Sequence, residues 1–168
     1  MHEEILKKLE ESPEYKDWKK SSEHSFLSHM IFFVEGDTTT ETQVGFYNEK
    51  RNKVKSFTMS ETTIMGLPED EVFKKEEDKV YPVDLSKVML DLQKASDEAE
   101  NVQKKNYPKH IPLKKIIVLQ NINGDNIWNI IYVTANFQTL NIKLDAETGN
   151  LIEHKLVDLI QFGNKKAS

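Results

Sequence analysis

The stretch Asn126–Leu151, NIWNIIYVTANFQTLNIKLDAETGNL, contains two runs in which apolar and polar residues alternate. Alternation with a period of two is typical of a strand that buries one face, so the stretch predicts two neighbouring strands. Asn136 and Phe137 lie between the runs and predict a tight turn. Gly149 ends the second run in a loop, because glycine readily adopts a left-handed conformation. These two strands set the register against which the other elements are placed.

A further apolar strand, residues 116–119, precedes this pair and is joined to it through Asn123-Gly124. Asn-Gly is the strongest short hairpin signal, because both central positions of the turn need positive φ. The hairpin therefore predicts a register. The predicted pairs are Leu119 with Trp128, Ile117 with Ile130 and Lys115 with Tyr132.

The turn at Asn136-Phe137 predicts the register between the last two strands in the same way. The predicted pairs are Val133 with Leu140, Ile131 with Ile142 and Asn129 with Leu144. A slip by one residue would move every side chain to the other face, so the two turns together assign both faces. One predicted face is apolar across all three strands. Its residues are Ile116, Val118, Ile131, Val133, Leu140, Ile142 and Leu144.

The longest helix signal in the chain begins at Asp84. Asp84 is a favourable N-cap residue, and Val83 and Val88 stand at the positions of a hydrophobic staple. Apolar residues then recur at helical spacing until Tyr107-Pro108 ends the pattern. We expect this helix to pack on the face that is apolar across three strands.

The opposite face of the predicted sheet holds the candidate binding surface. Its residues are Trp128, Ile130, Tyr132, Ile117 and Leu119, beside polar residues on the third strand. Either the first half of the chain covers this surface, or part of it, led by Trp128 and Tyr132, stays open for a protein partner, because aromatic residues dominate such contacts.

The first half of the chain predicts the same order of elements. Residues 5–9 predict a helix, and Ser12-Pro13 predicts the start of a second short one. Three strands follow, around residues 26–34, 44–47 and 54–59, and the first is apolar on both faces, as in a strand covered on both sides. The order helix, strand, strand, strand thus occurs twice.

These patterns predict an α+β protein built from two tandem repeats. Each repeat would be an antiparallel meander packed on one helix, and the two sheets would pack together through the junction of the halves. The expected boundaries are residues 1–64 for the first repeat, 65–82 for a charged connection and 83–168 for the second repeat.

Composition narrows the class of protein. The chain has 168 residues, 38% of them hydrophobic, and a net charge of -5, which disfavours nucleic-acid binding because that needs a basic face. No apolar run approaches the roughly 20 residues of a membrane span, and the acidic, amphipathic N-terminal sequence is unlike a secretion signal. We expect a cytoplasmic protein. The sequence does not decide its oligomeric state.

Candidate chemical sites are few. There is no cysteine, and the five histidines form no zinc-ligand pattern. The serines lack a Gly-x-Ser-x-Gly context, and the six glycines form no phosphate-binding loop. We therefore expect no catalytic residue, no metal and no cofactor, and no enzyme activity.

The second half resembles the PepSY domain family. The resemblance rests on the helix, the three meandering strands, Trp128 at the opening of the middle strand, and Asp145-Ala146 followed by Thr148-Gly149 and a short apolar strand. It covers roughly residues 83–156, and only the order of elements extends it to the first half. It implies a noncatalytic module with a regulatory or inhibitory role toward peptidases.

The sequence thus predicts a noncatalytic binding or regulatory module that acts on a protein partner through a sheet face or edge. The alternative is a small-molecule carrier or enzyme that uses a cleft between the two repeats. Such a cleft would be lined by Trp128, Tyr132, Phe32 and Phe33.

Overall fold

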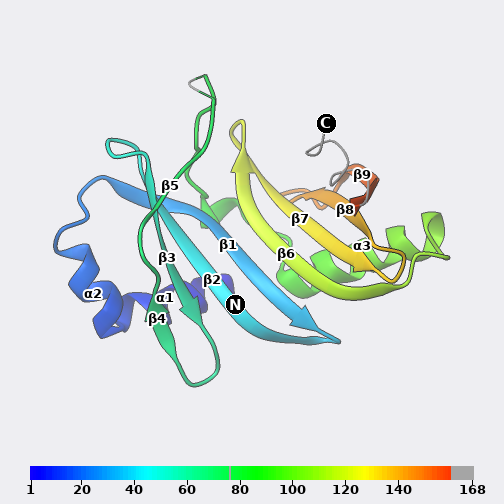
Figure 1. Cartoon of the computed structure of the whole chain (residues 1–168), viewed down its shortest axis with the longest axis horizontal. Coiled ribbons are helices and arrows are strands. Elements are labelled where there is room, and N and C mark those ends of the chain that lie inside the picture. Colours follow the sequence, from blue (N-terminus) through cyan, green and yellow to red (C-terminus); the bar gives the residue numbers. More distant parts are fainter. Residues whose placement is uncertain (76, 160–168) are drawn as a thin grey trace.

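The computed structural model describes residues 1–75 and 77–159, and these form an α+β fold with one antiparallel sheet (Figure 1). The helices are α1 (His2–Glu11), α2 (Pro13–Lys19), the short 3₁₀ helix η1 (Leu85–Lys87) and α3 (Leu92–Asn106). The strands of the first half are β1 (Ser25–Glu35), β2 (Thr38–Asn48), β3 (Lys53–Met59), β4 (Ile64–Gly66) and β5 (Asp70–Glu71). Those of the second half are β6 (Pro112–Ile122), β7 (Asp125–Thr134), β8 (Gln138–Asp145) and β9 (Leu151–Asp158).

The two halves join edge to edge in a single nine-stranded sheet. Its order is β4-β3-β2-β1-β6-β7-β8-β9, with β5 paired to β3. β1 and β6 pair antiparallel from His29 opposite Gln120 to Val34 opposite Lys115. The expected packing of two separate sheets at the junction is therefore wrong, because the halves share main-chain hydrogen bonds there.

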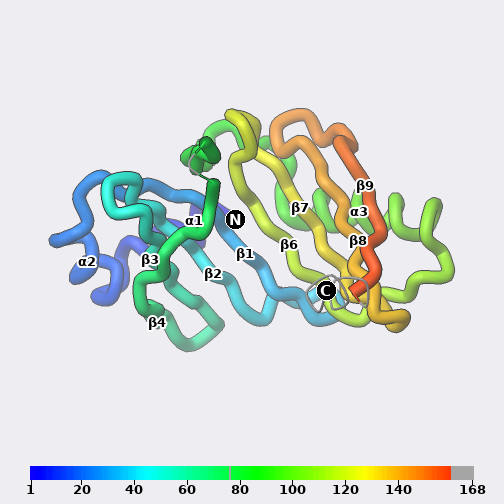
Figure 2. The backbone as a smooth tube through the Cα atoms, turned by 45° about the horizontal axis from the view of Figure 1, so that its top comes forward, coloured from blue at the N-terminus to red at the C-terminus, as the bar shows by residue number. Residues whose placement is uncertain are grey.

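The three α-helices of the described chain lie on one side of the sheet (Figures 1 and 2). α1 and α2 cover the first half, where Tyr15 and Trp18 pack against Phe46 and Phe57 with ring centroids 5.2 to 5.8 Å apart. Ser12 caps α2 as predicted, since its hydroxyl accepts from the Tyr15 main-chain nitrogen at 3.2 Å. α3 covers the second half.

The register of β6 with β7 is as predicted. Leu119 lies opposite Trp128, Ile117 opposite Ile130 and Lys115 opposite Tyr132. Asn123 and Gly124 both have positive φ, 55° and 104°, as the hairpin signal requires. This turn is fully accounted for by local sequence.

The register of β7 with β8 is shifted by one residue from the prediction. The observed pairs are Tyr132 with Leu140, Ile130 with Ile142 and Trp128 with Leu144. The loop is Ala135, Asn136 and Phe137, because β7 ends at Thr134 and β8 begins at Gln138. Phe137 takes the left-handed conformation, with φ 56°. A loop with one residue more than expected moves β8 by one position and turns each of its side chains over.

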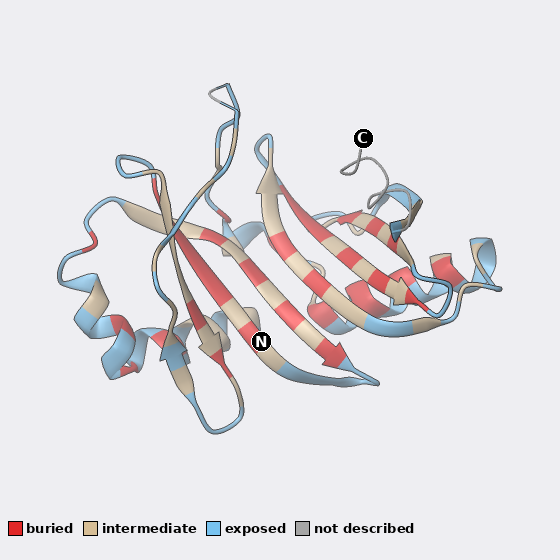
Figure 3. Ribbon diagram, viewed as in Figure 1, coloured by how far each residue is buried: buried red, intermediate tan, exposed pale blue. Residues whose placement is uncertain are grey.

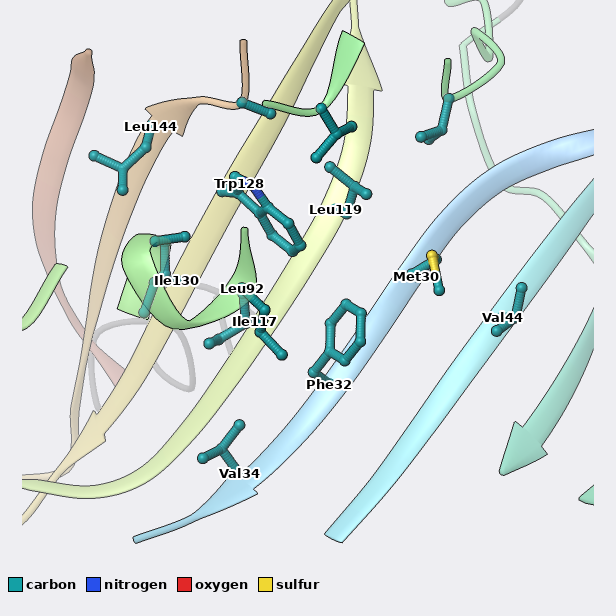
Figure 4. Packing of buried hydrophobic residues seen from close by; sticks show 14 of the residues in the cluster. Met30, Phe32, Val34, Val44, Leu92, Ile117, Leu119, Trp128, Ile130 and Leu144 are labelled. Atoms are coloured by element: carbon teal, nitrogen blue, oxygen red, sulfur yellow. The ribbon is translucent and has the colours of Figure 1, made fainter. Parts of the chain in front are cut away.

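The shift places the apolar side chains of β8 on the same face as the indole of Trp128. That face, and not the predicted one, lies under α3, whose Leu92, Ala95 and Ala99 are buried against it. Figure 4 shows Trp128, Ile130, Ile117 and Phe32 pointing into this core. The predicted assignment of faces is therefore wrong for the second half.

The main helix begins later than predicted. Asp84 caps only η1, where its carboxylate accepts from Ser86, and Asp91 caps α3 by accepting from the Lys94 nitrogen at 2.8 Å. The segment between them is extended, and the main-chain nitrogens of Met89 and Leu90 donate to the Ala146 carbonyl. The Leu90 carbonyl in turn accepts from Trp128 Nε1 at 2.9 Å.

Strand pairing within the predicted connection ties it to the first half. β4 crosses the expected boundary at residue 64, and β4 and β5 both pair with β3. The division into residues 1–64, 65–82 and 83–168 stays a prediction, as do the two tandem repeats.

Replacing Trp128 with phenylalanine tests the core assignment. Trp128 is wholly buried, so the smaller ring leaves a cavity and the Leu90 carbonyl loses its donor. We expect the free energy of unfolding in urea to fall by about 1–3 kcal/mol. Phe73→Ala is the control, since Phe73 is 94% exposed and its removal should leave stability unchanged. Equal stability of the two variants would contradict this core.

Candidate functional site

The surface predicted to bind a partner is closed. Trp128, Ile130, Tyr132, Ile117 and Leu119 are brought together as expected, but all of them are buried, with at most 4% of any side chain exposed. They form the core beneath α3 because the register of β8 inverts the faces. They cannot meet a partner in the folded protein.

The opposite face of the sheet carries a second group of apolar side chains, which we call the apolar strip. It consists of Ile31, Phe33, Ile116, Val118, Ile131 and Val133. Ile31 lies opposite Val118, Phe33 opposite Ile116, and Ile116 opposite Ile131, so the strip runs across β1, β6 and β7. Its residues are half-buried, and none of the α-helices of the described chain covers them (Figure 3). The strip crosses the junction between the halves.

A groove lies beside the strip at the junction of β1 and β6. Its volume is about 530 Å³, within the range of small-ligand sites. The connection after β5 forms one wall through Val72, Lys79 and Val80, and the sheet forms the floor. The remaining lining residues are Ser28, His29, Ile31, Val54, Glu71, Val118, Gln120 and Asn121.

A β-bulge and a glycine seat His29 in this groove. The register of β1 against β2 shifts between Leu27 and His29, so Ser28 is the extra residue of the bulge. His29 lies opposite Gly45. A Cβ atom at Gly45 would lie 2.1 Å from His29 Cε1. The imidazole thus lies against the main chain of β2, where only glycine leaves room.

The two contacts of the Ser28 hydroxyl select between the tautomers of His29. The Ser28 hydroxyl donates to the Gly45 carbonyl at 3.1 Å and lies 3.0 Å from His29 Nδ1. A hydroxyl has one proton. Because the carbonyl can only accept, both contacts are hydrogen bonds at the same time only in the tautomer in which Nδ1–H donates to Ser28 and Nε2 keeps its lone pair. In that tautomer Ser28 does not donate its proton to the imidazole, so the pair is not arranged as a nucleophile and its base.

Burial keeps this imidazole neutral. Desolvation lowers the pKa of His29 below its ordinary value of 6.5. The charged groups that line the groove with it are Glu71 and Lys79, one of each sign. At neutral pH the groove therefore presents an uncharged acceptor between aliphatic walls.

The alternative cleft is not formed by its predicted residues. Phe32 and Trp128 are buried together in the core, with ring centroids 5.9 Å apart, while Phe33 lies on the opposite face. Tyr132 lines a different cavity of about 290 Å³, with Glu100 and Lys115. Burial raises the pKa of its hydroxyl far above the usual range. The junction of the halves does hold a groove, but other residues line it.

Residues 1–75 and 77–159 offer neither a metal site nor a membrane-spanning helix. No group of three or more histidine, aspartate or glutamate side chains there is arranged to hold a metal ion. No helix in these ranges is both long and apolar enough to span a membrane.

Sequence reasoning missed His29, although one signal was present. Gly45 interrupts an otherwise strand-like run, and an isolated glycine in a strand indicates a bulge or a close approach of another group. Its partner could not be named, because the bulge that sets His29 opposite Gly45 depends on pairing between β1 and β2.

Comparison with known proteins shows a fold but no family. Neither the models of protein families nor the curated proteins include a match to this chain. Among solved structures, the chain is similar to a Clostridium difficile 630 protein described as a "putative lipoprotein". The TM-score is 0.53 at 13% identity, and the match covers 84% of this chain and 88% of that one. At this identity the likeness shows the fold alone.

The stability of the protein should depend on pH through His29. Below about pH 6.5, its ordinary pKa, the unfolded state binds this proton more readily than the folded state, so stability falls as the pH drops. His29→Gln should flatten the loss between pH 7 and 5, measured by urea denaturation. His2, whose pKa is also lowered by burial, should keep some slope in the variant. An unchanged slope would contradict a neutral, buried His29.

Proposed function

We propose that the protein is a noncatalytic binding module, and that it binds a protein partner through the apolar strip and the adjoining groove. The strip carries this proposal, because it groups large apolar side chains on a face that no α-helix of residues 1–75 and 77–159 covers. Contiguous apolar surface of this kind, bordered by polar residues, is typical of interaction sites. Gln43 and Asn141 border the strip on β2 and β8.

The size of the strip favours a short apolar segment of the partner over a second copy of the chain. Across the strands, the strip covers the two intervals between β1, β6 and β7, which is roughly 10 Å. Along each strand it covers two alternate residues, which is roughly 7 Å. A stable dimer buries about 800 Å² on each partner, which exceeds such a footprint several-fold. A segment of a few residues would fill the strip and reach the groove.

The noncatalytic assignment is supported by the polarity of the Ser28–His29 contact. In the tautomer that makes both contacts hydrogen bonds, the hydroxyl donates to the Gly45 carbonyl, so the imidazole does not activate it. The relation to PepSY domains, and with it a role in regulating peptidases, is part of this proposal. It is supported by the Asp145 turn, in which the carboxylate accepts from the main chain of Glu147 and Thr148 and Gly149 has a φ of 78°. A cytoplasmic location stays a prediction.

Selection from a displayed random-peptide library on the immobilised protein tests the binding surface. We expect peptides rich in aliphatic residues that bind the natural protein. Ile131→Lys places a charge in the middle of the strip, so it should weaken their binding by at least about tenfold, or about 1.4 kcal/mol, in calorimetric titration.

Met89→Lys is the matched control, because Met89 is 70% exposed and lies in the extended segment before α3. Its binding should equal that of the natural protein. The proposal fails if selection yields no such peptide, or if the selected peptides bind Ile131→Lys as tightly as the natural protein.

A further inference from the structure

We infer that the groove recognises a main-chain amide of the bound segment, with His29 Nε2 accepting the hydrogen bond from its N–H group. This inference rests on the proposed function, since it names the chemical group that the open face would recognise. Three features support it: the contacts of Ser28 with His29 and Gly45, the lining of the groove, and the position of Gln120.

The tautomer leaves one acceptor on the imidazole. In the tautomer that makes both contacts of Ser28 hydrogen bonds, Nδ1–H donates to the hydroxyl, and the hydroxyl donates to the Gly45 carbonyl. Among the described residues no donor forms a hydrogen bond with Nε2. Gly45 leaves the space in which the ring lies against β2, and the bulge at Ser28 sets its direction. The lone pair is thus held in place before a ligand arrives, which lowers the entropic cost of binding.

The lining of the groove selects an uncharged ligand with aliphatic substituents. Five of its eleven lining residues are aliphatic, namely Ile31, Val54, Val72, Val80 and Val118. Glu71 and Lys79 contribute opposite charges, so the groove favours neither an anion nor a cation. A hydrogen bond from a neutral N–H donor to an acceptor between such walls is stronger than in water, because the surroundings are less polar.

Gln120 supplies the complement to His29. It lies directly opposite His29 in the pairing of β1 with β6, and it lines the same groove. Its carboxamide can donate as well as accept. In an extended segment the N–H and the carbonyl of one residue point to the same side, so His29 can bind the N–H while Gln120 binds the carbonyl. Neither residue alone would distinguish an amide from an alcohol.

A pair of small probes isolates this chemistry in the full chain. N-isopentylacetamide carries an aliphatic group on a secondary amide, and isopentyl acetate has an ester oxygen in place of the N–H. We expect the amide to shift the NMR signals of Ile31, Val118 and His29 Nε2 in a saturable way. The ester should bind about tenfold more weakly, the effect of one hydrogen bond in a partly dry site.

Substitution of His29 should remove this preference. His29→Phe keeps a ring but has no acceptor, so the amide and the ester should bind it equally. His29→Gln keeps an acceptor and should retain part of the preference. His154→Phe is the control, since His154 lies on β9 and contacts Tyr107. If His29→Phe does not fold, the response of Nε2 in the natural protein decides.

Three results would overturn the inference: equal binding of amide and ester to the natural protein, an Nε2 signal that does not respond, or no saturable binding of the amide. Failure of the proposed function has a different signature. If selected peptides bind the natural protein and His29→Phe equally, the proposed binding module is supported and the proposed role of His29 is wrong. If the amide binds through His29 but no peptide depends on Ile131, the proposed protein partner is wrong.

Discussion

The antiparallel pairing of β1 with β6 is the constraint on which the rest of the structure depends. Each of these strands would otherwise be the edge of a meander, with unpaired main-chain groups. Their pairing makes one sheet and lets Phe32 of the first half pack against Trp128 of the second. The same pairing sets His29 beside Gln120. The core, the apolar strip and the groove therefore all cross the junction, and none of them belongs to one half alone.

Local turn chemistry decided how far the sequence could predict the second half. The pair Asn123-Gly124 predicts its own turn conformation, and the register that follows from this turn is the one observed. Phe137 gives no such signal, because a bulky residue at positive φ is uncommon. One unrecognised loop residue was enough to exchange the covered and open faces of β8. A hairpin whose register the sequence predicts and a hairpin whose register it does not predict are thus only a few residues apart.

The helix and the groove show two other limits of sequence reasoning. Asp84 and Asp91 are both good N-caps, and only the hydrogen bonds of Met89 and Leu90 to Ala146 decide that α3 starts at the second. His29 is unremarkable in the sequence, since its setting depends on a bulge, on a glycine of the neighbouring strand and on a strand from the other half. The site is formed by contacts between segments that are distant in the sequence. Hydrophobic periodicity does not predict such contacts.

The pairing across the junction also governs how the chain can fold. His29 and Gln120 are separated by 120 − 29 = 91 positions, and closing a flexible loop of that length costs roughly 4 kcal/mol in chain entropy. The hairpins β1–β2 and β6–β7 close over far shorter distances, so they can form before the two edges meet. Until they meet, both edges expose free main-chain donors and acceptors, which are the groups through which strands of different molecules associate. Refolding of this chain should therefore slow and lose yield as its concentration rises.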